Sequence, residues 1–586
     1  MGIFDVLNLI CGLALFLFGM EVLGNALKKT AGRQLKTILG NLTSNKLKGF
    51  LLGLGVTGVI QSSSATTVMV VGFVNSGSMT LGQAVGVIMG ANVGTAVTSW
   101  ITALSGIDSA GTTVGLLQWL KPDAWMPILA LIGICLLMFA KNGRKQDIGT
   151  ILLGFAVLMV GMDVMSGAVS GLKSSESFQS ILVMFENPIL GVLVGTVVTA
   201  IVQSSSASVG ILQSLTMTGA ISYGSAIPII LGQNIGTCAT ALLSSISAGK
   251  NGKRAAFVHL YFNIICVVLV LSAFYLLNFI FKFAIVNSII NPWGVAAVHT
   301  VFKLISVAIM APATKLLEKL ACLTVRGSDD DKDRFTHMLD ERLLDTPGVA
   351  LARARAVTAE MATLSVASLK DALALFDGYD EKKTEDIRKA EDTVDIYEDV
   401  LGSYLVKLSS QDMTPQDSHE VTKLLHMIGD FERISDHAVN LLESVEELRE
   451  KKLDFSEEAK RELSVLYSAI SEIVTITTDS FVSSDLSLAA RVEPLEQVVD
   501  YLKDFIRHSH IKRLQESKCT IEHGFVLSDV LTSLERVSDH CSNIAGCYIK
   551  LSLHDDLSVH EYLNKIKTGG EEFHRMYGEY MQKYAI

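Results

Sequence analysis

The sequence predicts an all-α, polytopic membrane protein with two inverted repeats and re-entrant hairpins, joined to a cytoplasmic helical-bundle domain. Two halves of contrasting composition support this prediction. Residues 1–320 hold 18 Lys and Arg against 9 Asp and Glu, and long apolar runs recur along them. The remaining residues hold 31 basic and 51 acidic side chains, with apolar residues at helical spacing. We expect runs long enough to span a bilayer in the first half only.

The third observation is an internal duplication. Three pairs of segments are separated by the same 142 residues: Gln61–Thr66 and Gln203–Ser208, Gly90–Thr95 and Gly232–Thr237, and Gly19–Glu21 and Gly161–Asp163. The first pair has the sequences QSSSAT and QSSSAS. Three matches at one offset, with no insertion between them, indicate a repeated unit. Each polar stretch lies between apolar runs, where we expect the chemistry to take place.

The apolar runs predict seven membrane spans. They are expected at 3–27, 80–103 (interrupted by Gly90–Thr95), 124–140, 149–171, 222–247, 256–281 and 293–317. The polar stretch of the first repeat separates two shorter apolar pieces, 47–60 and 65–77. About 14 residues of helix reach only about 21 Å, short of a bilayer core of about 30 Å. Such pieces fit a re-entrant hairpin, and 188–219 is the matching hairpin of the second repeat.

The distribution of basic residues predicts the orientation. Lys and Arg gather at 28–48, 141–145, 250–254 and near 315–319, whereas the alternate loops hold single lysines. By the positive-inside rule the N-terminus lies outside and the acidic half is cytoplasmic. The N-terminus lacks a basic region and a small-residue cleavage site, so we expect it to form the first span. Three spans per repeat is an odd number, so the second repeat is inverted.

The paired Gln-Ser-Ser-Ser-Ala motifs resemble the sodium–phosphate cotransporter family related to the type II transporters, over roughly residues 5–320. The string His259-Leu260-Tyr261-Phe262-Asn263 is also similar to a family string. A second such string, starting at His299, ends in Lys303, where Asn is expected. The resemblance implies secondary active symport of inorganic phosphate with sodium, and a chain that is not an enzyme.

Neutral side-chain oxygens suit a weakly held sodium ion, whereas serine hydroxyls and the free N–H groups of half-helix N-termini suit a phosphate oxyanion. The expected phosphate-binding residues are Ser62, Ser63, Ser64, Ser204, Ser205 and Ser206. The expected sodium-binding residues are Gln61, Thr66, Asn92, Thr95, Gln203, Ser208, Asn234 and Thr237. The alternative is that these serine-rich breaks only satisfy helix ends or pack small interfaces.

Other polar residues of the apolar half have two interpretations each. Glu21 and Asp163 correspond across the repeats, and intramembrane acids are costly and often functional. Glu21 also lies near the basic end of its span, where Lys28 is an alternative partner. Lys303 lies within a span, as an ion pair or as part of a site. His259 and His299 are expected to form packing hydrogen bonds.

The acidic half starts with a linker at 325–347 and continues with helices of about thirty residues, typical of antiparallel bundles. The expected helices are 349–376, 380–409, 415–450, 456–482, 485–516 and 520–551, with a tail helix at 558–584. The hexapeptide Glu432–His437 (ERISDH) recurs 103 residues later as Glu535–His540 (ERVSDH). The acid pair Glu391 and Asp395 recurs in the same way, 105 residues later.

These acids are spaced i, i+4, so each pair shares one helix face. The pattern resembles the PhoU family, with two three-helix repeats and paired E-x-x-x-D motifs, over about 345–550. Four carboxylates on facing helices suit a divalent metal. The expected metal ligands are Glu391, Asp395, Glu432 and Asp436, and Glu496, Asp500, Glu535 and Asp539. The alternative is a solvated face paired with Arg433 or Arg536. The resemblance implies a role in phosphate sensing or gating.

The expected domains are 1–145 as the first transmembrane repeat, 146–320 as the second repeat with an extra span, 321–346 as a linker, and 347–586 as the PhoU-like cytoplasmic domain. Expected cofactors are a sodium ion and a divalent metal in the PhoU-like domain. Expected partners are inorganic phosphate, sodium and the lipid bilayer, with no nucleic acid. A homodimer is an assembly that the sequence leaves open. The expected location is the cell (inner) membrane.

Three alternatives for the function remain open. One is a membrane-anchored phosphate sensor that no longer transports, and another is a phosphate exporter of the same fold. The third is an intramembrane serine hydrolase, which is disfavoured because no G-x-S-x-G motif is present and no His is near either serine stretch in sequence. The direction of flux, the stoichiometry and the selectivity among phosphate, arsenate and sulfate are not determined by the sequence.

Overall fold

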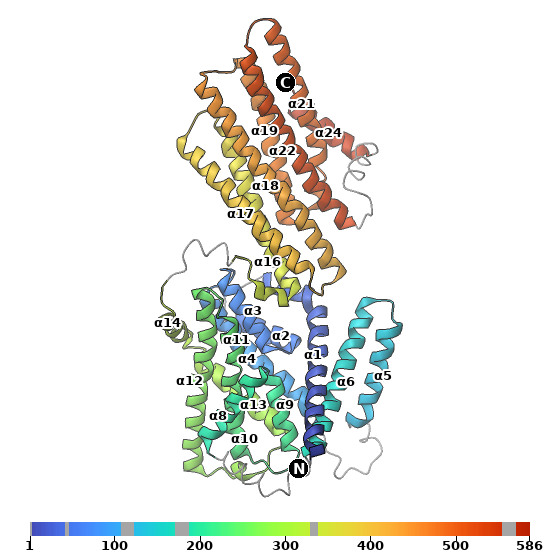
Figure 1. Ribbon diagram of the computed structural model, residues 1–586, viewed down its shortest axis with the longest axis vertical. Helices are drawn as coiled ribbons and strands as arrows, with labels where there is room; N and C mark the ends of the chain where they lie inside the picture. The colour runs from blue at the N-terminus through green and yellow to red at the C-terminus, as the bar shows by residue number, and fades with distance from the viewer. Residues whose placement is uncertain (1–2, 41–45, 107–121, 170–186, 328–337, 554–569) are drawn as a thin grey trace. The chain divides into compact units, whose positions relative to one another are not determined.

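The computed structural model describes residues 3–40, 46–106, 122–169, 187–327, 338–553 and 570–586 (Figure 1). The described chain is helical, with one isolated antiparallel bridge between Ser222 and Ile289, so the predicted all-α fold is confirmed. The chain divides into two compact units, Met1–Val349 and Ala350–Ile586.

The helices of the first unit follow the duplication. Its first repeat contains α1 (Ile3–Gly40), α2 (Lys46–Ile60), α3 (Ser63–Asn75), α4 (Leu81–Ala103) and α5 (Pro122–Phe139). Its second repeat contains α6 (Gly143–Val169), α8 (Pro188–Val202), α9 (Ser205–Thr216), α10 (Tyr223–Gly236), α11 (Cys238–Ser244) and α12 (Lys250–Phe281). Helices α13 (Pro292–Met310) and α14 (Thr314–Thr324) follow. The two predicted re-entrant hairpins correspond to the short pairs α2–α3 and α8–α9.

Several predicted boundaries were wrong. Helix α1 continues to Gly40, well beyond the span predicted to end at 27, and α13 ends at Met310. Helix α4 runs without interruption through Gly90–Thr95, because the glycines there serve close packing against α2 and not a break. The break occurs in the second repeat, where Thr237 separates α10 from α11.

Seven helices of the described residues are long and apolar enough to cross a membrane, and one of them lies in the second unit. That helix, α19 (Glu457–Ser483), contradicts the expectation that such runs occur in the first half only. Its apolar residues, such as Ile470 and Ile473, are buried inside the bundle, which explains its composition without a membrane. By contrast, Ile189 and Phe279 of the first unit are 76% and 83% exposed, as expected for a lipid-facing surface.

Helices α1 and α6 pack against each other through glycines. A Cβ on Gly12 would lie 2.7 Å from the backbone N of Met165, and a Cβ on Gly154 would lie 2.7 Å from the backbone N of Leu23. Residue numbers rise along α1 as they fall along α6, so the helices are antiparallel. The two contacts are equivalent under the duplication, because the 142-residue offset relates Gly12 to Gly154 and Leu23 to Met165. A two-fold axis perpendicular to both helices therefore relates the repeats, and the predicted inversion is confirmed.

The last helix of the first repeat, α5, does not pack as its counterpart α12 does, and the extra helix α13 takes its place. Helix α5 packs against α6 and not against α4. Helix α4 packs instead against α13, where Trp100 Nε1 donates to Thr300 Oγ1 at 3.0 Å. In the second repeat, the α10–α11 pair packs in the same antiparallel way against α12, with Cys238 Sγ 3.6 Å from the carbonyl of His259. Helix α13 thus occupies beside α4 the place that α12 occupies beside α10.

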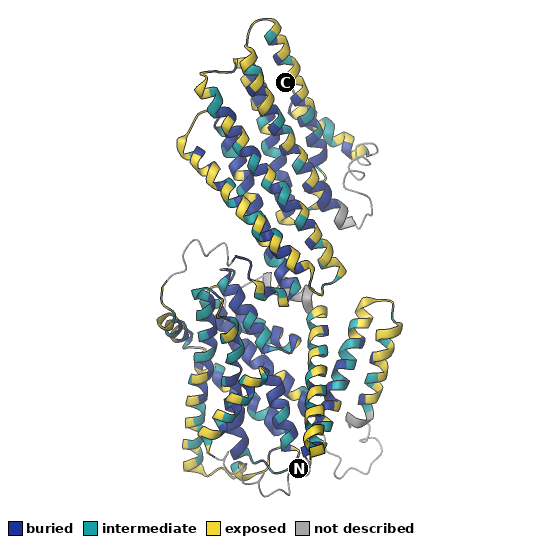
Figure 2. Cartoon of the chain, in the orientation of Figure 1, coloured by how far each residue is buried: buried dark blue, intermediate teal, exposed yellow. Residues whose placement is uncertain are grey.

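The second unit is a bundle of long helices. They are α16 (Pro347–Ala374), α17 (Glu381–Ser409), α18 (Pro415–Glu450), α19, α20 (Leu486–Ala489), α21 (Val492–Gln515), α22 (Ile521–Leu553) and α24 (Glu571–Lys583). The predicted helices are present in order, although 485–516 divides into α20 and α21. Residues 558–569 of the predicted tail helix lie outside the described residues. Along each long helix a buried stripe faces the bundle and an exposed stripe faces outward (Figure 2).

Candidate functional site

Each hairpin of the first unit turns at its glutamine. Gln61 and Gln203 have positive φ angles, 60° and 55°, and their N–H groups close α2 and α8 on the carbonyls of Thr57 and Thr199. This left-handed conformation terminates a helix and reverses the chain. The next residue, Ser62 or Ser204, then caps the following helix by accepting from the N–H three residues on. The repeated sequence therefore encodes the same helix-stop-helix geometry twice.

The two turns meet at the pseudo-two-fold axis. Ser63 Oγ and Ser205 Oγ are 3.4 Å apart although 142 residues separate them. They are the first residues of α3 and α9, so two helix N-termini converge. The first N–H groups of a helix have no partner within it, and the helix dipole places partial positive charge there. The convergence creates a position suited to an anion.

A cavity of about 280 Å³ lies at this junction. It is lined by both polar stretches and by one face of α1: Leu17, Met20, Glu21, Gly24, Asn25, Lys28, Ile60, Gln61, Ser62, Ser63, Ser64, Gln203, Ser204, Ser205 and Ser206. All six residues expected to bind phosphate are therefore brought to one cavity, together with the two glutamines expected to bind sodium.

The remaining residues expected to bind sodium lie behind the cavity lining, in two symmetric groups. Thr57 Oγ1 donates to Thr66 Oγ1 at 3.0 Å, and Thr199 Oγ1 donates to Ser208 Oγ at 2.8 Å. Thr98 Oγ1 also donates to the Gln61 side-chain oxygen at 2.8 Å. These bonds join each hairpin internally and, through Thr98, fasten the first hairpin to α4.

The predicted residues on α4, α10 and at the α10–α11 junction bond to their own helices. Asn92 Nδ2 donates to Ile88 O at 3.1 Å, and Asn234 Nδ2 donates to Ile230 O at 2.8 Å. The hydroxyls of Thr95 and Thr237 likewise donate to carbonyls four residues earlier. These four side chains are buried and present their oxygens within the transmembrane unit, but they do not line the cavity.

Sequence reasoning singled out Glu21 of α1 and named Lys28 as its alternative partner, but it missed that one face of this helix lines the cavity. Glu21, Asn25 and Lys28 all reach the cavity, whereas Asp163, the counterpart of Glu21, is exposed on α6. Lys28 brings a positive charge to the cavity, and no other Lys or Arg of the described residues lines it. The spacing of residues 17, 21, 24 and 28 was a signal for this stripe, because it places them on one helix face. Thr57 and Thr199 were also missed, although the 142-residue offset relates them.

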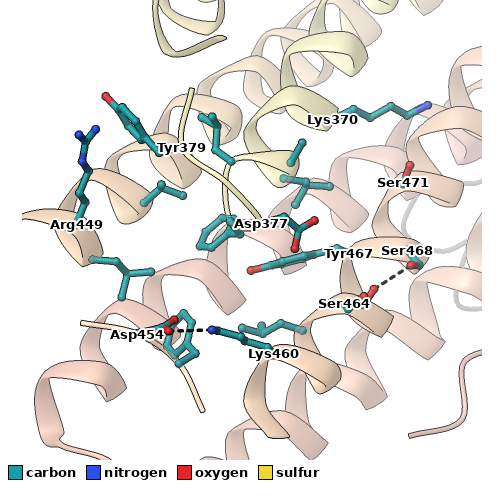
Figure 3. A pocket seen from close by; sticks show the side chains of 18 of the residues that line it. Lys370, Asp377, Tyr379, Arg449, Asp454, Lys460, Ser464, Tyr467, Ser468 and Ser471 are labelled. Carbon is teal, nitrogen blue, oxygen red and sulfur yellow. Dashed lines mark hydrogen bonds and ion pairs between the residues drawn. The ribbon is translucent and has the colours of Figure 1, made fainter. Parts of the chain in front are cut away.

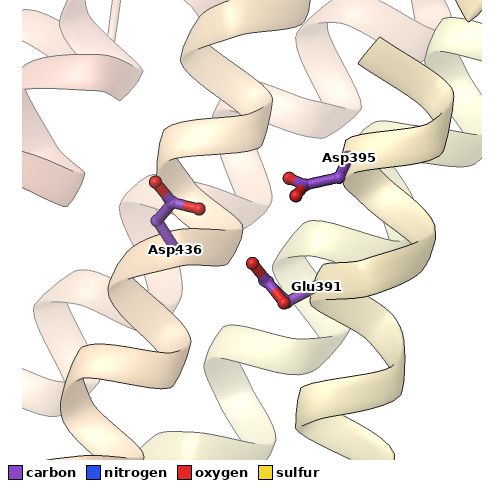
Figure 4. A group of neighbouring side chains, drawn as sticks. All are labelled: Glu391, Asp395 and Asp436. Carbon is purple, nitrogen blue, oxygen red and sulfur yellow. The ribbon is translucent and has the colours of Figure 1, made fainter. Parts of the chain in front are cut away.

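Three carboxylates gather in the second unit. Glu391 and Asp395 of α17 and Asp436 of α18 offer oxygen atoms that all lie within 4.8 Å of one another (Figure 4). Burial and the neighbouring Asp395 carboxylate raise the pKa of Glu391. Burial and the Asp436 carboxylate raise the pKa of Glu432 to about 7. The carboxylates are thus placed where a cation would relieve their repulsion.

The matching carboxylates of the second repeat have a different environment. Lys503 Nζ lies 2.6 Å from Glu535, 3.7 Å from Asp500 and 3.9 Å from Asp504. By the 105-residue offset of this helix, Lys503 corresponds to Glu398 in the first repeat. The first cluster therefore has an additional acid where the second cluster has an internal ammonium group. Two predicted ligands of this set remain. Glu496 is buried and accepts from the Gln497 side chain at 2.7 Å, and Asp539 lines a cavity described below.

The repeated hexapeptides also supply a cavity of about 440 Å³. Its lining takes the same four residue types from each repeat: Arg433, Asp436, His437, Asn440, Arg536, Asp539, His540 and Asn543. Burial, His540 and the two arginines lower the pKa of His437 to about 4. The arginine and histidine of each motif thus meet across the two PhoU-like repeats, beside the acid pairs.

A further cavity, of about 580 Å³, lies between the ends of α16, α18 and α19 (Figure 3). The charged groups around it are partly paired with each other: Lys460 contacts Asp454 at 2.8 Å, and Arg449 stacks on Tyr379 with 4.0 Å to the ring centroid. Tyr467 points inward and its buried hydroxyl makes no hydrogen bond within the described residues. None of the residues expected to bind phosphate, sodium or metal lies here.

The first unit, with inverted repeats and two hairpins whose polar tips meet in a cavity, has the architecture of a secondary transporter. The family model of Na+/Pi-cotransporters matches residues 15–167 and 168–309, and the chain belongs to this family. The PhoU domain model matches residues 358–445 and 463–547, so the second unit contains a PhoU domain. The resemblances stated from sequence are confirmed.

Curated relatives agree with this assignment. A protein of Salmonella typhimurium named "Putative inorganic phosphate export protein YjbB" is 25% identical over 552 residues, covering 92% of this chain and 96% of the relative. The YqeW protein of Bacillus subtilis is 32% identical over 259 residues, 44% of this chain and 78% of the relative. The sodium-dependent phosphate transport protein 2A of Rattus norvegicus is 37% identical over 142 residues, 22% of each chain. No solved structure matches the chain.

Proposed function

We propose that this chain is a sodium-coupled inorganic phosphate transporter whose second unit is a cytoplasmic regulatory domain. The observation that carries the proposal is the convergence of two helix N-termini, at Ser63 and Ser205, on one cavity. Phosphate carries between one and two negative charges near neutral pH, and burying it without counter-charge is costly. Two helix ends supply about half a unit each, and Lys28 adds a charge at the cavity.

A co-transported cation is the simplest source of further positive charge. The neutral oxygens of Gln61 and Gln203 lie at the cavity, and the symmetric hydroxyl pairs lie directly behind them. Sodium and phosphate would then strengthen each other's binding by the same factor. A relative named for phosphate export covers most of the chain, so net export by the same machinery is the second candidate. Inverted repeats present the same site to either side, and the gradients decide the direction.

Radiolabelled phosphate uptake into proteoliposomes tests the transport proposal. Uptake should rise with an imposed sodium gradient, and Ser205→Ala should raise the phosphate KM by about tenfold or more, since a hydrogen bond to a charged group contributes roughly 1.5–3 kcal/mol. Ser214→Ala is the matched control, because that serine on the same helix bonds to its own Gly210 carbonyl and does not line the cavity. Uptake that is equal at zero and saturating sodium would contradict coupling to sodium.

The distribution of charge at the two ends of the first unit supports the proposed orientation. Lys29 and Asp147 form an ion pair at 3.7 Å, which joins the basic end of α1 to the basic start of α6. The lysines and arginine at the start of α12 lie at this end as well, because Gly249 N donates to Asn75 Oδ1 at the end of α3. Among the described residues, the opposite end has Lys282 alone at the α12 terminus. The basic end should face the cytoplasm.

Cysteine labelling tests this orientation. A membrane-impermeant reagent should label Asn287→Cys from outside intact cells and Gly143→Cys only after permeabilisation. Both positions are exposed, and a Cβ at Gly143 meets no atom within 4 Å, so neither substitution should disturb the fold. The exposed native Cys11, Cys135 and Cys322 would first be replaced by serine. Labelling of Gly143→Cys in intact cells would reverse the proposed topology.

The regulatory role is supported by a segment we call the strap, residues 338–346. Within the first unit, Asp340 Oδ2 accepts from Asn75 Nδ2 at 2.8 Å, and Asn75 lies at the end of α3. Leu343 is fully buried and packs on Gly72 of the same helix. The strap thus ties the phosphate-site hairpin to the segment that leads directly into the second unit.

Hydrogen exchange of the full chain tests the strap. Binding of Mn²⁺ to the wild type should change amide exchange in α3, and Asp340→Ala should remove that response while accelerating exchange in α3 several-fold. Asp345→Ala is the control, because that exposed strap residue makes none of these contacts. An α3 response in Asp340→Ala equal to that of the wild type would rule out transmission through this contact.

We further propose that the Glu391, Asp395 and Asp436 cluster holds a divalent metal, which would neutralise the carboxylates and fix α17 against α18. The full chain should bind about one Mn²⁺ tightly, and Asp436→Ala should abolish this binding. Asp539→Ala is the matched control in the second cluster, where Lys503 already supplies positive charge. Unchanged metal content in Asp436→Ala would refute the site, whereas loss in Asp539→Ala would show that both clusters bind metal.

A further inference from the structure

Lys303 is a charged side chain buried inside the transmembrane unit. It is 4% exposed, and its ammonium group donates to the carbonyl oxygen of Asn92 at 2.6 Å. That is its one hydrogen bond within the described chain, and no carboxylate there pairs with it. The groups that face it closely enough to interact are His259, His299 and Cys238. An intramembrane charge without a fixed counter-ion is costly and usually functional.

A comparison of α13 with α12 shows which residue corresponds to Lys303. Helix α13 packs on α4 as α12 packs on α10 and α11, and both contacts are antiparallel. Ser99 Oγ is 2.9 Å from the His299 side chain in the first contact, and Cys238 Sγ is 3.6 Å from the backbone carbonyl of His259 in the second. Four residues beyond each histidine, α13 has Lys303 and α12 has Asn263. Lys303 is therefore the spatial counterpart of a neutral carboxamide.

The neighbours of the two residues also correspond. Lys303 contacts the carbonyl of Asn92, whereas Asn263 Nδ2 donates to Cys238 Sγ at 3.3 Å, and that sulfur lies 3.7 Å from the carbonyl of Asn234. Asn92 and Asn234 are equivalent in the duplication. The same carbonyl oxygen thus faces an ammonium group in one half and a neutral, polar group in the other. A carbonyl oxygen that accepts a lysine ammonium in a buried position is also a ligand type suited to sodium.

Helix α4 connects this charge to the phosphate cavity. Thr98 is six residues beyond Asn92 on α4, about 9 Å along the helix axis, and it bonds to Gln61 at the cavity. A charge inside the membrane unit acts over a longer distance than a charge in water, because the dielectric constant there is lower. The described residues around Lys303 provide no negative charge, and a transported anion would balance its ammonium group.

We propose that the Lys303 ammonium takes the place of a co-transported cation beside Asn92, so that phosphate transport by this chain uses fewer sodium ions than it would with Asn at this position. This inference rests on the proposed phosphate transport and specifies its coupling. The fixed charge stays with the protein, whereas a sodium ion would enter and leave with the substrate. Lys303 would therefore set the stoichiometry without contacting phosphate.

The test compares Lys303→Asn and Lys303→Gln with the wild type and with Lys303→Met. The two carboxamide variants restore a neutral oxygen beside the Asn92 carbonyl, whereas methionine removes the charge without an oxygen ligand. Dual-label flux with ²²Na⁺ and ³²P-phosphate in proteoliposomes should show about one more sodium per phosphate in the carboxamide variants and a steeper dependence of uptake on sodium. The methionine variant should bind phosphate more weakly with no gain in sodium.

Equilibrium ²²Na⁺ binding to the purified full chain gives a readout that does not need flux. It should show about one additional sodium per chain in Lys303→Asn or Lys303→Gln, whichever variant remains folded by size-exclusion chromatography, and none in Lys303→Met. Carboxamide variants that transport phosphate with the wild-type sodium ratio and bind no extra sodium would overturn the inference. A wild type that moves no phosphate under any gradient would instead refute the proposed function, while the sodium-binding comparison would still decide the role of Lys303.

Discussion

The meeting of two helix N-termini inside the transmembrane unit is the interaction on which the rest of this structure depends. A backbone break at membrane depth leaves N–H and C=O groups that lipid cannot satisfy. Here the break is enclosed on both sides, by the opposite hairpin at Ser63 and Ser205 and by one face of α1. The serine caps satisfy one donor in each helix, and the first residues of both helices line a cavity. A polar substrate is what such an arrangement can accommodate.

The glycines explain how these short helices are held. A Cβ on Gly90 would lie 1.9 Å from the Phe50 carbonyl oxygen, and a Cβ on Gly232 would lie 2.1 Å from the Val192 carbonyl oxygen. These positions are equivalent in the duplication, and both bring a hairpin helix into backbone contact with its neighbour. Because lipid tails are as apolar as side chains, close packing and hydrogen bonds must supply the association energy. The glycines therefore recur at the 142-residue offset because both repeats need the close packing, and the serines recur because both hairpins contribute to the polar cavity.

Much of this architecture could be predicted from the sequence because the duplication preserves both spacing and residue type. The hairpins, the inversion and the helical bundle of the second unit follow from runs, offsets and basic loops. The contribution of α1 could not be derived in the same way, because Lys28 reaches the cavity from a distant segment, and Asp163, the counterpart of Glu21, is exposed on α6. The uninterrupted α4 was also missed, since Gly90–Thr95 continues as helix whereas the equivalent Gly232–Thr237 ends at the break between α10 and α11. Local sequence does not distinguish those cases.

Symmetry and its violations have separate roles in this molecule. Thr57 with Thr66 in the first hairpin, and Thr199 with Ser208 in the second, form equivalent hydrogen bonds that are related by the 142-residue offset. Equivalent internal bonds suit a site that must open to either side of a membrane. The charges, by contrast, are asymmetric in both units. Lys303 corresponds spatially to Asn263, and Lys503 corresponds to Glu398 in the other unit. In each case a fixed ammonium corresponds to a neutral or acidic side chain at a similar place in the same unit, Lys303 on the extra helix α13 and Lys503 in a duplicated helix. Similar helix packing is therefore combined with different electrostatics. Ion requirements can then differ between the two halves of a unit without any change in how its helices pack.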